Sequence, residues 1–306
     1  MVRSLFAAIA SLGLAFGGAL AQPPLAAKLN DATSGPSAVS LWRTGDADTT
    51  IYLMGTVHVL DPTIDWQHRI FEEAWASADT LILETDVTSP EAQKTLIKEL
   101  NTHGFNAPGT TLATFFTDEE VQRIDSALSD INLTVASMAP MRPWLANIQV
   151  ANTAMMSVGG SVEGGLEIVL TARANEQGKS IEYFETVSEQ LSMIAAPGDE
   201  AWAEALLVSA EDLSDVDAYF ADLIGAWYSG NEARLDVLMT EALETSPSVA
   251  ESLLYERNEN WARQLDRIIE KKRGTYFVAV GAAHLVGERS IQDYLKKRGH
   301  NTRRLN

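Results

Sequence analysis

The chain has 306 residues, a formal net charge of −19 at pH 7 and no cysteine. Such a length can bury a substantial core in one large domain or two small ones. The absence of cysteine excludes disulfides and a lipoprotein anchor, so stability must come from the core. The acidic excess argues against nonspecific binding to nucleic acid or docking on anionic lipid.

The first 21 residues have the pattern of a secretory signal. Arg3 precedes an apolar run from Leu5 to Ala21, and Ala19-Leu20-Ala21 supplies the small-x-small pattern before Gln22. An uncleaved anchor is the alternative, although a run of about 17 residues is at the short limit for a span. We expect cleavage after Ala21 and a periplasmic or secreted chain, 22–306, that forms a single domain and has no stable membrane insertion.

Two strands and a tight turn are predicted after the leader. Residues 38–44 and 50–56 are mostly apolar, and Gly45-Asp46-Ala47-Asp48 joins them as a hairpin turn. A helix is expected over 64–78 from apolar residues at helical spacing. The continuous apolar run 79–85 predicts a strand that is covered on both faces.

Helices dominate from Pro90 to about Gly274. Thr117 and Glu120 have the spacing of a capping box, and the tryptophans on helical patterns are expected to pack in the core. A further strand is predicted at 179–185, and strand 275–281, helix 288–299 and strand 300–305 close the chain. We therefore expect an α/β (α+β) fold with a central mixed sheet built from the terminal strand–helix units. The helical insertion, about 90–273, would cover one face of this sheet.

Two apolar strands each end in a Gly-x-x-His motif. Gly55 precedes His58, and Gly281 precedes His284. If the two strands are parallel neighbours, the histidines lie side by side at the carboxyl edge, where α/β sheets bind ligands. Neutral imidazoles are good ligands for Zn, Mn, Co or Fe. A hydrogen-bonded structural role is the alternative for either histidine.

A candidate third ligand ends the buried run "LILETD". Glu84 would be costly there unless a metal or a histidine compensated its charge. Two histidines and a carboxylate have the composition of a hydrolytic metal site with open positions. Asp86 has the position of a loop or cap residue. The other histidines lack such a context and are predicted to be surface or edge residues: His68, His103 and His300.

The ordered motifs resemble those of the TraB/GumN (TraB/PrgY/GumN) family, which is related to Tiki-type metalloproteases. The matching pieces are "LWRTGDADTTIYLMGTVHVLDP", "LILETD", "GGLEIVL", "YERNENWARQL" and "YFVAVGAAHLVG", and the resemblance runs from about Ala38 to Leu305. It implies an active site made by His58, His284 and Glu84. The family's G-x-D motif stands here as Gly165-Leu166-Glu167, a conservative carboxylate replacement.

Further site residues follow from the same resemblance. Glu185 and Gln190 match the segment after the next strand, and Arg257 and Asn258 match an Arg-Asn motif at a helix start. An arginine there could bind a substrate carboxylate or a developing oxyanion. The alternatives are a capping role for Glu185, a solvated Gln190, and a surface pair of Arg257 with a neighbouring glutamate.

The leading hypothesis is an exported metal-dependent hydrolase that cleaves peptide bonds. A divalent cation (Mn, Co or Zn) would be held by His58, His284 and Glu84, with Glu84, Glu185 and Arg257 as catalytic groups. Gln190, Arg257 and Asn258 would contact a peptide or small-molecule substrate. One alternative is a non-catalytic protein that binds a peptide, a pheromone or haem in the same pocket, and another is hydrolysis of an ester.

Overall fold

A computed structural model describes residues 32–306 apart from 212, 214–215 and 245. Within these residues the strands form one six-stranded sheet in the order β4-β3-β5-β2-β1-β6. The strands are β1 (Leu41–Gly45), β2 (Thr49–Thr56), β3 (Thr80–Leu83), β4 (Ser180–Tyr183), β5 (Gly274–Gly281) and β6 (Arg303–Arg304). The predicted signal segment 1–21 lies outside the described residues.

The sheet is mixed, as predicted. Strands β4, β3, β5 and β2 run parallel, whereas β1 pairs antiparallel with both β2 and β6. The β1–β2 hairpin closes where the N–H of Asp46 donates to the carbonyl of Thr49 at 2.9 Å. Gly45 has φ +130, a backbone conformation that L side chains rarely adopt, which explains a glycine at this turn.

Helices fill the rest of the described chain. They are α3 (Arg69–Ser77), α4 (Pro90–His103), α5 (Asp118–Ala127), α6 (Pro143–Ser157), α7 (Leu166–Glu176), α8 (Val187–Ala195), α9 (Asp199–Glu211), α10 (Val216–Tyr228), α11 (Glu232–Glu244), α12 (Pro247–Ala250), α13 (Glu256–Lys271) and α14 (Ile291–Lys297). Short turns of other helical types are η1 (Leu112–Phe115), η2 (Ser129–Ile131), η4 (Glu251–Tyr255) and η5 (Ala282–Leu285). No helix in this part of the chain has the length and apolar character needed to cross a bilayer.

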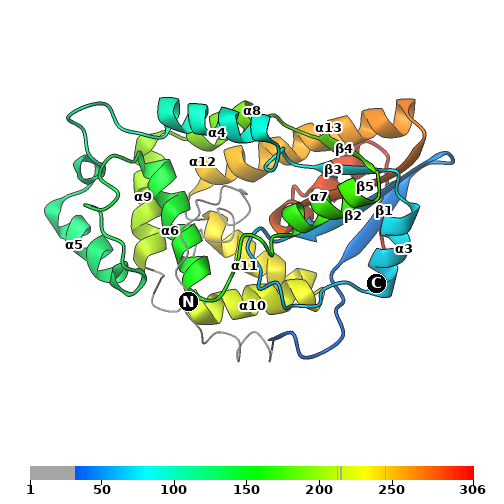
Figure 1. Cartoon of the computed structure of the whole chain (residues 1–306), viewed down its shortest axis with the longest axis horizontal. Helices are drawn as coiled ribbons and strands as arrows, with labels where there is room; N and C mark the ends of the chain where they lie inside the picture. Colours follow the sequence, from blue (N-terminus) through cyan, green and yellow to red (C-terminus); the bar gives the residue numbers. More distant parts are fainter. Residues whose placement is uncertain (1–31, 212, 214–215, 245) are drawn as a thin grey trace.

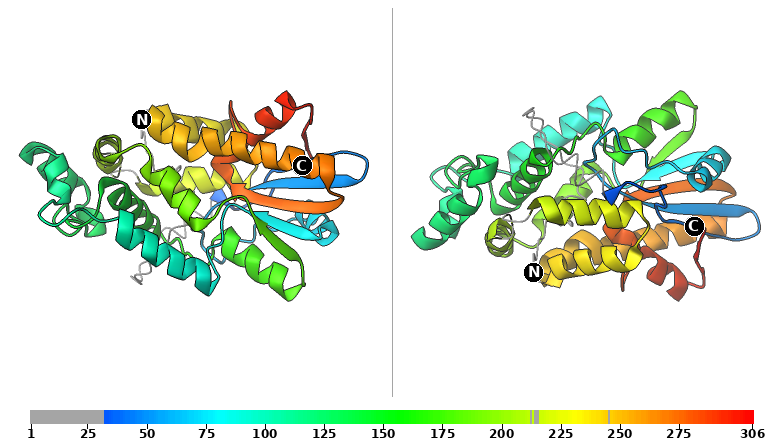
Figure 2. Two further views of the ribbon diagram at one scale, coloured as in Figure 1. Left: turned by 90° about the horizontal axis from the view of Figure 1, so that it is seen from above. Right: turned by 90° about the horizontal axis from the view of Figure 1, so that it is seen from below.

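Helices cover both faces of the sheet, and the expectation that the insertion covers one face is corrected here. Phe277 and Ala279 of β5 pack in the cluster that includes Trp75 of α3 and Leu170 of α7. The alternate residues of β5 pack in the opposite cluster with α13 and α14. A strand buried on both faces reads as a continuous apolar run, which is the pattern of β5. The views from above and below show the sheet between these two helical layers (Figure 2).

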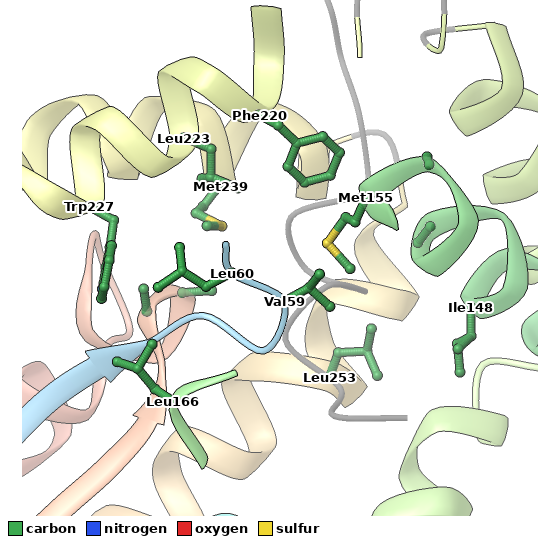
Figure 3. Packing of buried hydrophobic residues seen from close by; sticks show 14 of the residues in the cluster. Val59, Leu60, Ile148, Met155, Leu166, Phe220, Leu223, Trp227, Met239 and Leu253 are labelled. Carbon is green, nitrogen blue, oxygen red and sulfur yellow. The ribbon is translucent and has the colours of Figure 1, made fainter. Parts of the chain in front are cut away.

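The remaining helices extend beyond the carboxyl ends of the parallel strands. Figure 1 shows α5, α6 and α9 at one end of the molecule and the sheet at the other. Val59 and Leu60, just after β2, pack in the same hydrophobic cluster as Met155 of α6 and Phe220 of α10 (Figure 3). This cluster ties the helical part to the end of the sheet where the two histidine motifs lie.

The predicted helix 64–78 begins later than expected. Its first residue is Arg69, because His68 is the N-cap and its Nδ1 accepts from the N–H of Phe71 at 3.2 Å. The Nε2 of His68 therefore carries the proton and donates to the carbonyl of Val39 at 2.9 Å. Trp66 is buried although it lies before the helix, so core packing was predicted correctly and its helical position was not.

Candidate active site

The carboxyl ends of the four parallel strands bring four of the predicted residues together. His58 follows β2, Glu84 follows β3, Glu185 follows β4, and His284 lies in η5 directly after β5. Strands β2 and β5 are parallel neighbours, with Thr56 opposite Gly281. The close packing of β2 against η5 explains Gly55, because a Cβ at that position would lie 2.9 Å from the Cα of Ala282.

The orientation of the His284 ring is fixed by Asn258. The amide nitrogen of Asn258 donates to the carbonyl of Arg289 at 2.9 Å, so its Oδ1 faces the imidazole. That oxygen lies 2.6 Å from Nδ1 of His284 and can only accept. The proton of the neutral imidazole is therefore on Nδ1, and Nε2 keeps its lone pair.

His284 is neutral at pH 7. Its side chain is 0% exposed, and burial is the largest cause that holds its pKa well below the ordinary value of 6.5. The positive charge of Arg257 and the nearby His58 act in the same direction. Nε2 of His284 lies 3.6 Å from Oε1 of Glu84. These two acceptors lie side by side inside the protein, where the N–H of Gly281 donates to Oε1 at 2.7 Å and Nη1 of Arg257 lies 3.5 Å from Nε2, so positive charge near them is favourable.

Arg257 is the centre of a buried ionic cluster. Its guanidinium donates to Oε2 of Glu84 at 2.7 Å and to Oε2 of Glu185 at 3.0 Å. Trp261 also donates to Glu185, from Nε1 to Oε1 at 2.7 Å. The three charged side chains are nearly inaccessible to solvent and have a formal excess of one negative charge.

The pKa values of this cluster reflect that excess. Burial raises the pKa of the Glu185 carboxyl above its ordinary value, and the charge of Glu84 adds to this, while Arg257 offsets only part of it. Burial alone would lower the pKa of Arg257, but the two glutamates outweigh it, so the guanidinium stays charged. The cluster can therefore accommodate additional positive charge.

A π-helical turn precedes Arg257. Arg257 lies at the start of α13, as the resemblance implied, because that helix begins at Glu256 and follows α12 and the π turn η4 without a break. The carbonyl of Leu253, inside the π turn, accepts from Nη1 of Arg257 at 3.1 Å. Single π turns are frequent at functional sites, because they re-aim side chains within a helix.

His58 is held by a second carboxylate, from α7. Its Nδ1 lies 2.8 Å from Oε2 of Glu167, and Thr56 donates to the other oxygen of that carboxylate. Burial raises the pKa of Glu167, but His58 and Thr56 together outweigh it, so the group stays ionised. An ionised carboxylate accepts the Nδ1 proton and orients the ring of His58, as carboxylates do for histidine ligands in metal sites.

Glycine allows this contact between α7 and the loop after β2. A Cβ on Gly165 would lie 2.2 Å from the carbonyl oxygen of His58, which no side chain could tolerate. The N–H of Leu166 donates to the carbonyl of Val57 at 3.1 Å. The start of α7 is therefore fixed against this loop, and Glu167 is placed beside the imidazole.

A pocket of about 380 Å³ opens beside His58. Its polar lining includes Glu167, Thr85, Asp86 and Gln190, and its apolar wall comes largely from α4. The side chain of His58 is 8% exposed and lines the pocket, whereas that of His284 has no access to solvent. A substrate in the pocket would therefore meet His58 first.

The sequence matches a known family over most of its length. The sequence profile of the TraB/PrgY/gumN family matches residues 40–304. The chain belongs to the TraB/PrgY/gumN family.

Individual relatives are distant. The protein YbaP of Escherichia coli (strain K12) is 23% identical over 247 residues, which cover 80% of this chain and 87% of YbaP, and YbaP of Shigella flexneri gives the same values. A protein named Metalloprotease TIKI homolog, from Amphimedon queenslandica, is 37% identical over 54 residues, or 17% of this chain and 11% of that protein. No solved structure matches this member of the TraB/PrgY/gumN family.

The predicted substrate contacts divide into two groups in this TraB/PrgY/gumN chain. Gln190 lines the pocket. Arg257 and Asn258 are buried and bonded to Glu84, Glu185 and His284, so they hold other site residues and do not line the pocket. Asp86 accepts from the N–H groups of Thr88 and Ser89, the loop role that the sequence indicated.

Several residues with a role in the site were not found from the sequence. Thr56 and Trp261 bind two of the site carboxylates, and the bond from Glu167 to His58 was not predicted. The sequence did indicate a special position for Glu167, since it lies just after a Gly-Gly pair at a helix start. Its partner His58 could not be identified, because it is more than a hundred positions away in the chain. Thr85, which lines the pocket, gave no signal of its own.

The donor set of the predicted metal site fits a divalent cation in its chemistry. His58 and His284 both have Nδ1 bonded to an oxygen acceptor, so Nε2 is the ring atom of each that would bind a cation. Glu84 adds a carboxylate oxygen next to one of them. Over the described ranges, however, no three His, Cys, Asp or Glu side chains already converge as a ligand cluster.

Proposed function

We propose that this TraB/PrgY/gumN protein is an exported metal-dependent hydrolase of peptide bonds. The observation that carries the proposal is the approach of two acceptors, Nε2 of His284 and Oε1 of Glu84, at 3.6 Å in a buried cluster with a negative excess. The similarity of a short segment to a protein named Metalloprotease TIKI homolog supports the same reaction class.

The residues have distinct roles in this proposal. His58 and His284 would hold a divalent cation through Nε2, with Glu84 as a further ligand or as general base. Imidazole and carboxylate donors suit Zn, Mn or Co. When bound, such a cation supplies Lewis acidity and lowers the pKa of a water from 15.7 towards about 7.

The buried groups would keep the reacting side chains in place. Arg257 and the N–H of Gly281 bind the two oxygens of Glu84, at 2.7 Å each, so its carboxylate is held in one orientation. Glu185 and Trp261 hold the guanidinium in turn. Arg257 and Glu185 are therefore positioning residues in this proposal, and Gln190 is a substrate contact.

Metal analysis of the purified chain 22–306 is the first test. We expect the wild type to retain Zn, Mn or Co after dialysis, and His58→Ala and His284→Ala to lose it. His103→Ala is the matched control, because His103 lies on the exposed side of α4, 3.6 Å from Glu99. A wild type that retains no divalent cation, or two variants that bind it like the control, would contradict the proposal.

A peptide-library assay, analysed by mass spectrometry, tests the reaction. We expect cleavage by the metal-loaded wild type, none in chelator, and a loss of at least about a thousandfold in Glu84→Gln, the range of effect for groups that act directly on the reacting atoms. Metal binding without cleavage of any peptide would favour the non-catalytic binding protein instead. Mass determination of the chain recovered from periplasm or medium tests the expected cleavage after Ala21.

A further inference from the structure

The pocket beside His58 has an apolar wall that is partly core and partly exposed. Helix α4 contributes Ala92, Leu96, Ile97 and Leu100 to the lining. Ile97 is 60% exposed, the highest value among the large hydrophobic side chains described as exposed. Val187 of α8 lines the same pocket. An exposed apolar side chain in a concave, largely apolar surface next to a reactive group is typical of a ligand site.

The polar end of the pocket contains a hydroxyl that needs a partner. Thr85 is only 5% exposed, and its Oγ1 has no hydrogen-bond partner in the part of the chain that the structure describes. A buried hydroxyl without a partner costs free energy, and native proteins leave few of them. Thr85 follows Glu84 directly in the chain and lines the pocket together with His58. The amide of Gln190 lines the same region.

The charges of the pocket restrict what can bind. Two carboxylates, Asp86 and Glu167, line it, and none of the described residues around it is a lysine or an arginine. An acidic side chain would therefore be repelled, and it would also lose its hydration against an apolar wall. An uncharged apolar side chain fits both the wall and the charge.

We propose that this pocket is the subsite for an apolar side chain of the peptide substrate, with the Thr85 hydroxyl hydrogen-bonded to the substrate backbone. The occupant is an extended peptide with a Leu-like or Phe-like residue close to the bond that is cleaved. A peptide carbonyl or N–H can pair with Thr85 Oγ1 whatever the side chain, whereas α4 and α8 select the side chain. This inference rests on the proposed function and names the substrate class.

Binding is measured by fluorescence anisotropy with labelled Gly-Ser peptides that carry a single Leu, Phe, Lys or Asp. The wild type is titrated in chelator and again with Mn²⁺, so that affinity is read separately from cleavage. Burial of a Leu-sized side chain predicts a dissociation constant at least about tenfold lower for the Leu peptide than for the Asp peptide. Equal affinity for the two peptides, or no binding under either condition, would overturn the inference.

Two variants test the assigned contacts. Ile97→Asp is expected to raise the dissociation constant of the Leu peptide at least about tenfold. Val237→Asp changes a 42% exposed valine outside the pocket and should leave this dissociation constant unchanged. Thr85→Val keeps the shape of the side chain but removes its hydroxyl. It should raise the dissociation constant of every peptide about three- to tenfold without lowering the melting temperature of the protein. If Ile97→Asp binds like Val237→Asp, the apolar wall is not the subsite.

The outcomes separate this inference from the proposed function. A Leu preference that Ile97→Asp removes, with no cleavage of any peptide, would support the subsite and contradict the hydrolase. Cleavage at the same rate whether or not the peptide has an apolar residue would support the hydrolase and contradict the subsite.

Discussion

At the scale of single residues, the site depends on side chains that hold other side chains. Asn258 determines which nitrogen of His284 carries the proton, and Glu167 does the same for His58. Arg257 binds Glu84 and Glu185 at once, although they follow different strands. Each reactive group thus has one acceptor or donor orientation, which is the condition for a preorganised site.

Replacing Arg257 should lower the free energy of unfolding much more than replacing Glu185. Arg257→Met leaves two buried carboxylates without a counter-ion, so the free energy of unfolding at pH 7 should fall by about 3–5 kcal/mol. Glu185→Gln leaves one arginine with one glutamate and keeps an acceptor for Trp261, so its effect should be much smaller, within about 1.5 kcal/mol. Urea unfolding in chelator measures both, and equal losses would contradict this description of the cluster.

At the scale of elements, α7 connects the site to the sheet. Its first turn places Glu167 against His58, and its last turn is anchored to α3 by Arg173, whose Nη1 donates to Oε1 of Glu72 at 2.9 Å. The same guanidinium lies 5.3 Å from the ring centre of Trp75. Both ends of α7 are therefore fixed. The packing of this helix on the sheet thus determines where Glu167 holds the loop that carries His58.

The ion pair between α3 and α7 predicts a pH effect of known sign. The hydrogen bond from Arg173 is the largest cause that lowers the pKa of Glu72 below 4.5, and burial opposes it. A carboxyl whose pKa is lowered by folding stabilises the fold above the unfolded pKa, and this stabilisation is lost as pH falls through the folded pKa. The Glu72 side chain is 43% exposed, so solvent screens the pair and the contribution at pH 7 is up to about 1 kcal/mol.

Glu72→Gln tests this directly by urea unfolding at pH 7 and pH 3. The variant should be less stable than wild type at pH 7 and should approach it at pH 3. Glu73→Gln is the control, because Glu73 pairs only with Arg69 on the same helix and is 61% exposed. A difference between Glu72→Gln and wild type that is as large at pH 3 as at pH 7 would contradict the assigned cause.

At the scale of the whole molecule, the helical part and the sheet share one core. A single cluster of buried residues runs from Val39 through Trp144 and Trp227 to Ala283, and so includes the sheet, α6 and α10. Figure 1 shows the same continuity between the helices at one end and the strands at the other. A shared core favours cooperative folding of the chain as one domain.

The chain 22–306 is therefore expected to unfold in one transition. Tryptophan fluorescence reports on both regions, since Trp75 packs on the sheet and Trp202 lies in the helical part, and far-UV circular dichroism reports mainly on the helices. The two signals should have the same midpoint and the same denaturant dependence. Separate midpoints would indicate two domains and contradict the single-domain prediction.

Much of the local structure could be predicted from the sequence. The capping box at Thr117 and Glu120 forms as expected, with both of its hydrogen bonds. The apolar runs of β2, β3 and β5 form strands, and the histidine of each Gly-x-x-His motif follows its strand as predicted. One error was the start of α3, which a histidine cap delays, whereas α13 begins at Glu256 and so places Arg257 at a helix start as predicted.

The features that the sequence determined all depend on neighbouring positions. Apolar periodicity, turn glycines and caps act over a few residues, and they were sufficient for the strands, for their ends, and therefore for the placement of His58 and His284. The partners of those residues depend on distant parts of the chain, since Glu84 and Arg257 are 173 positions apart and Thr56 and Glu167 are 111 apart. Only the packing of α7 and α13 on opposite faces of the sheet brings such residues within bonding distance, so the tautomers, the buried charge and the pocket wall were decided by the tertiary structure.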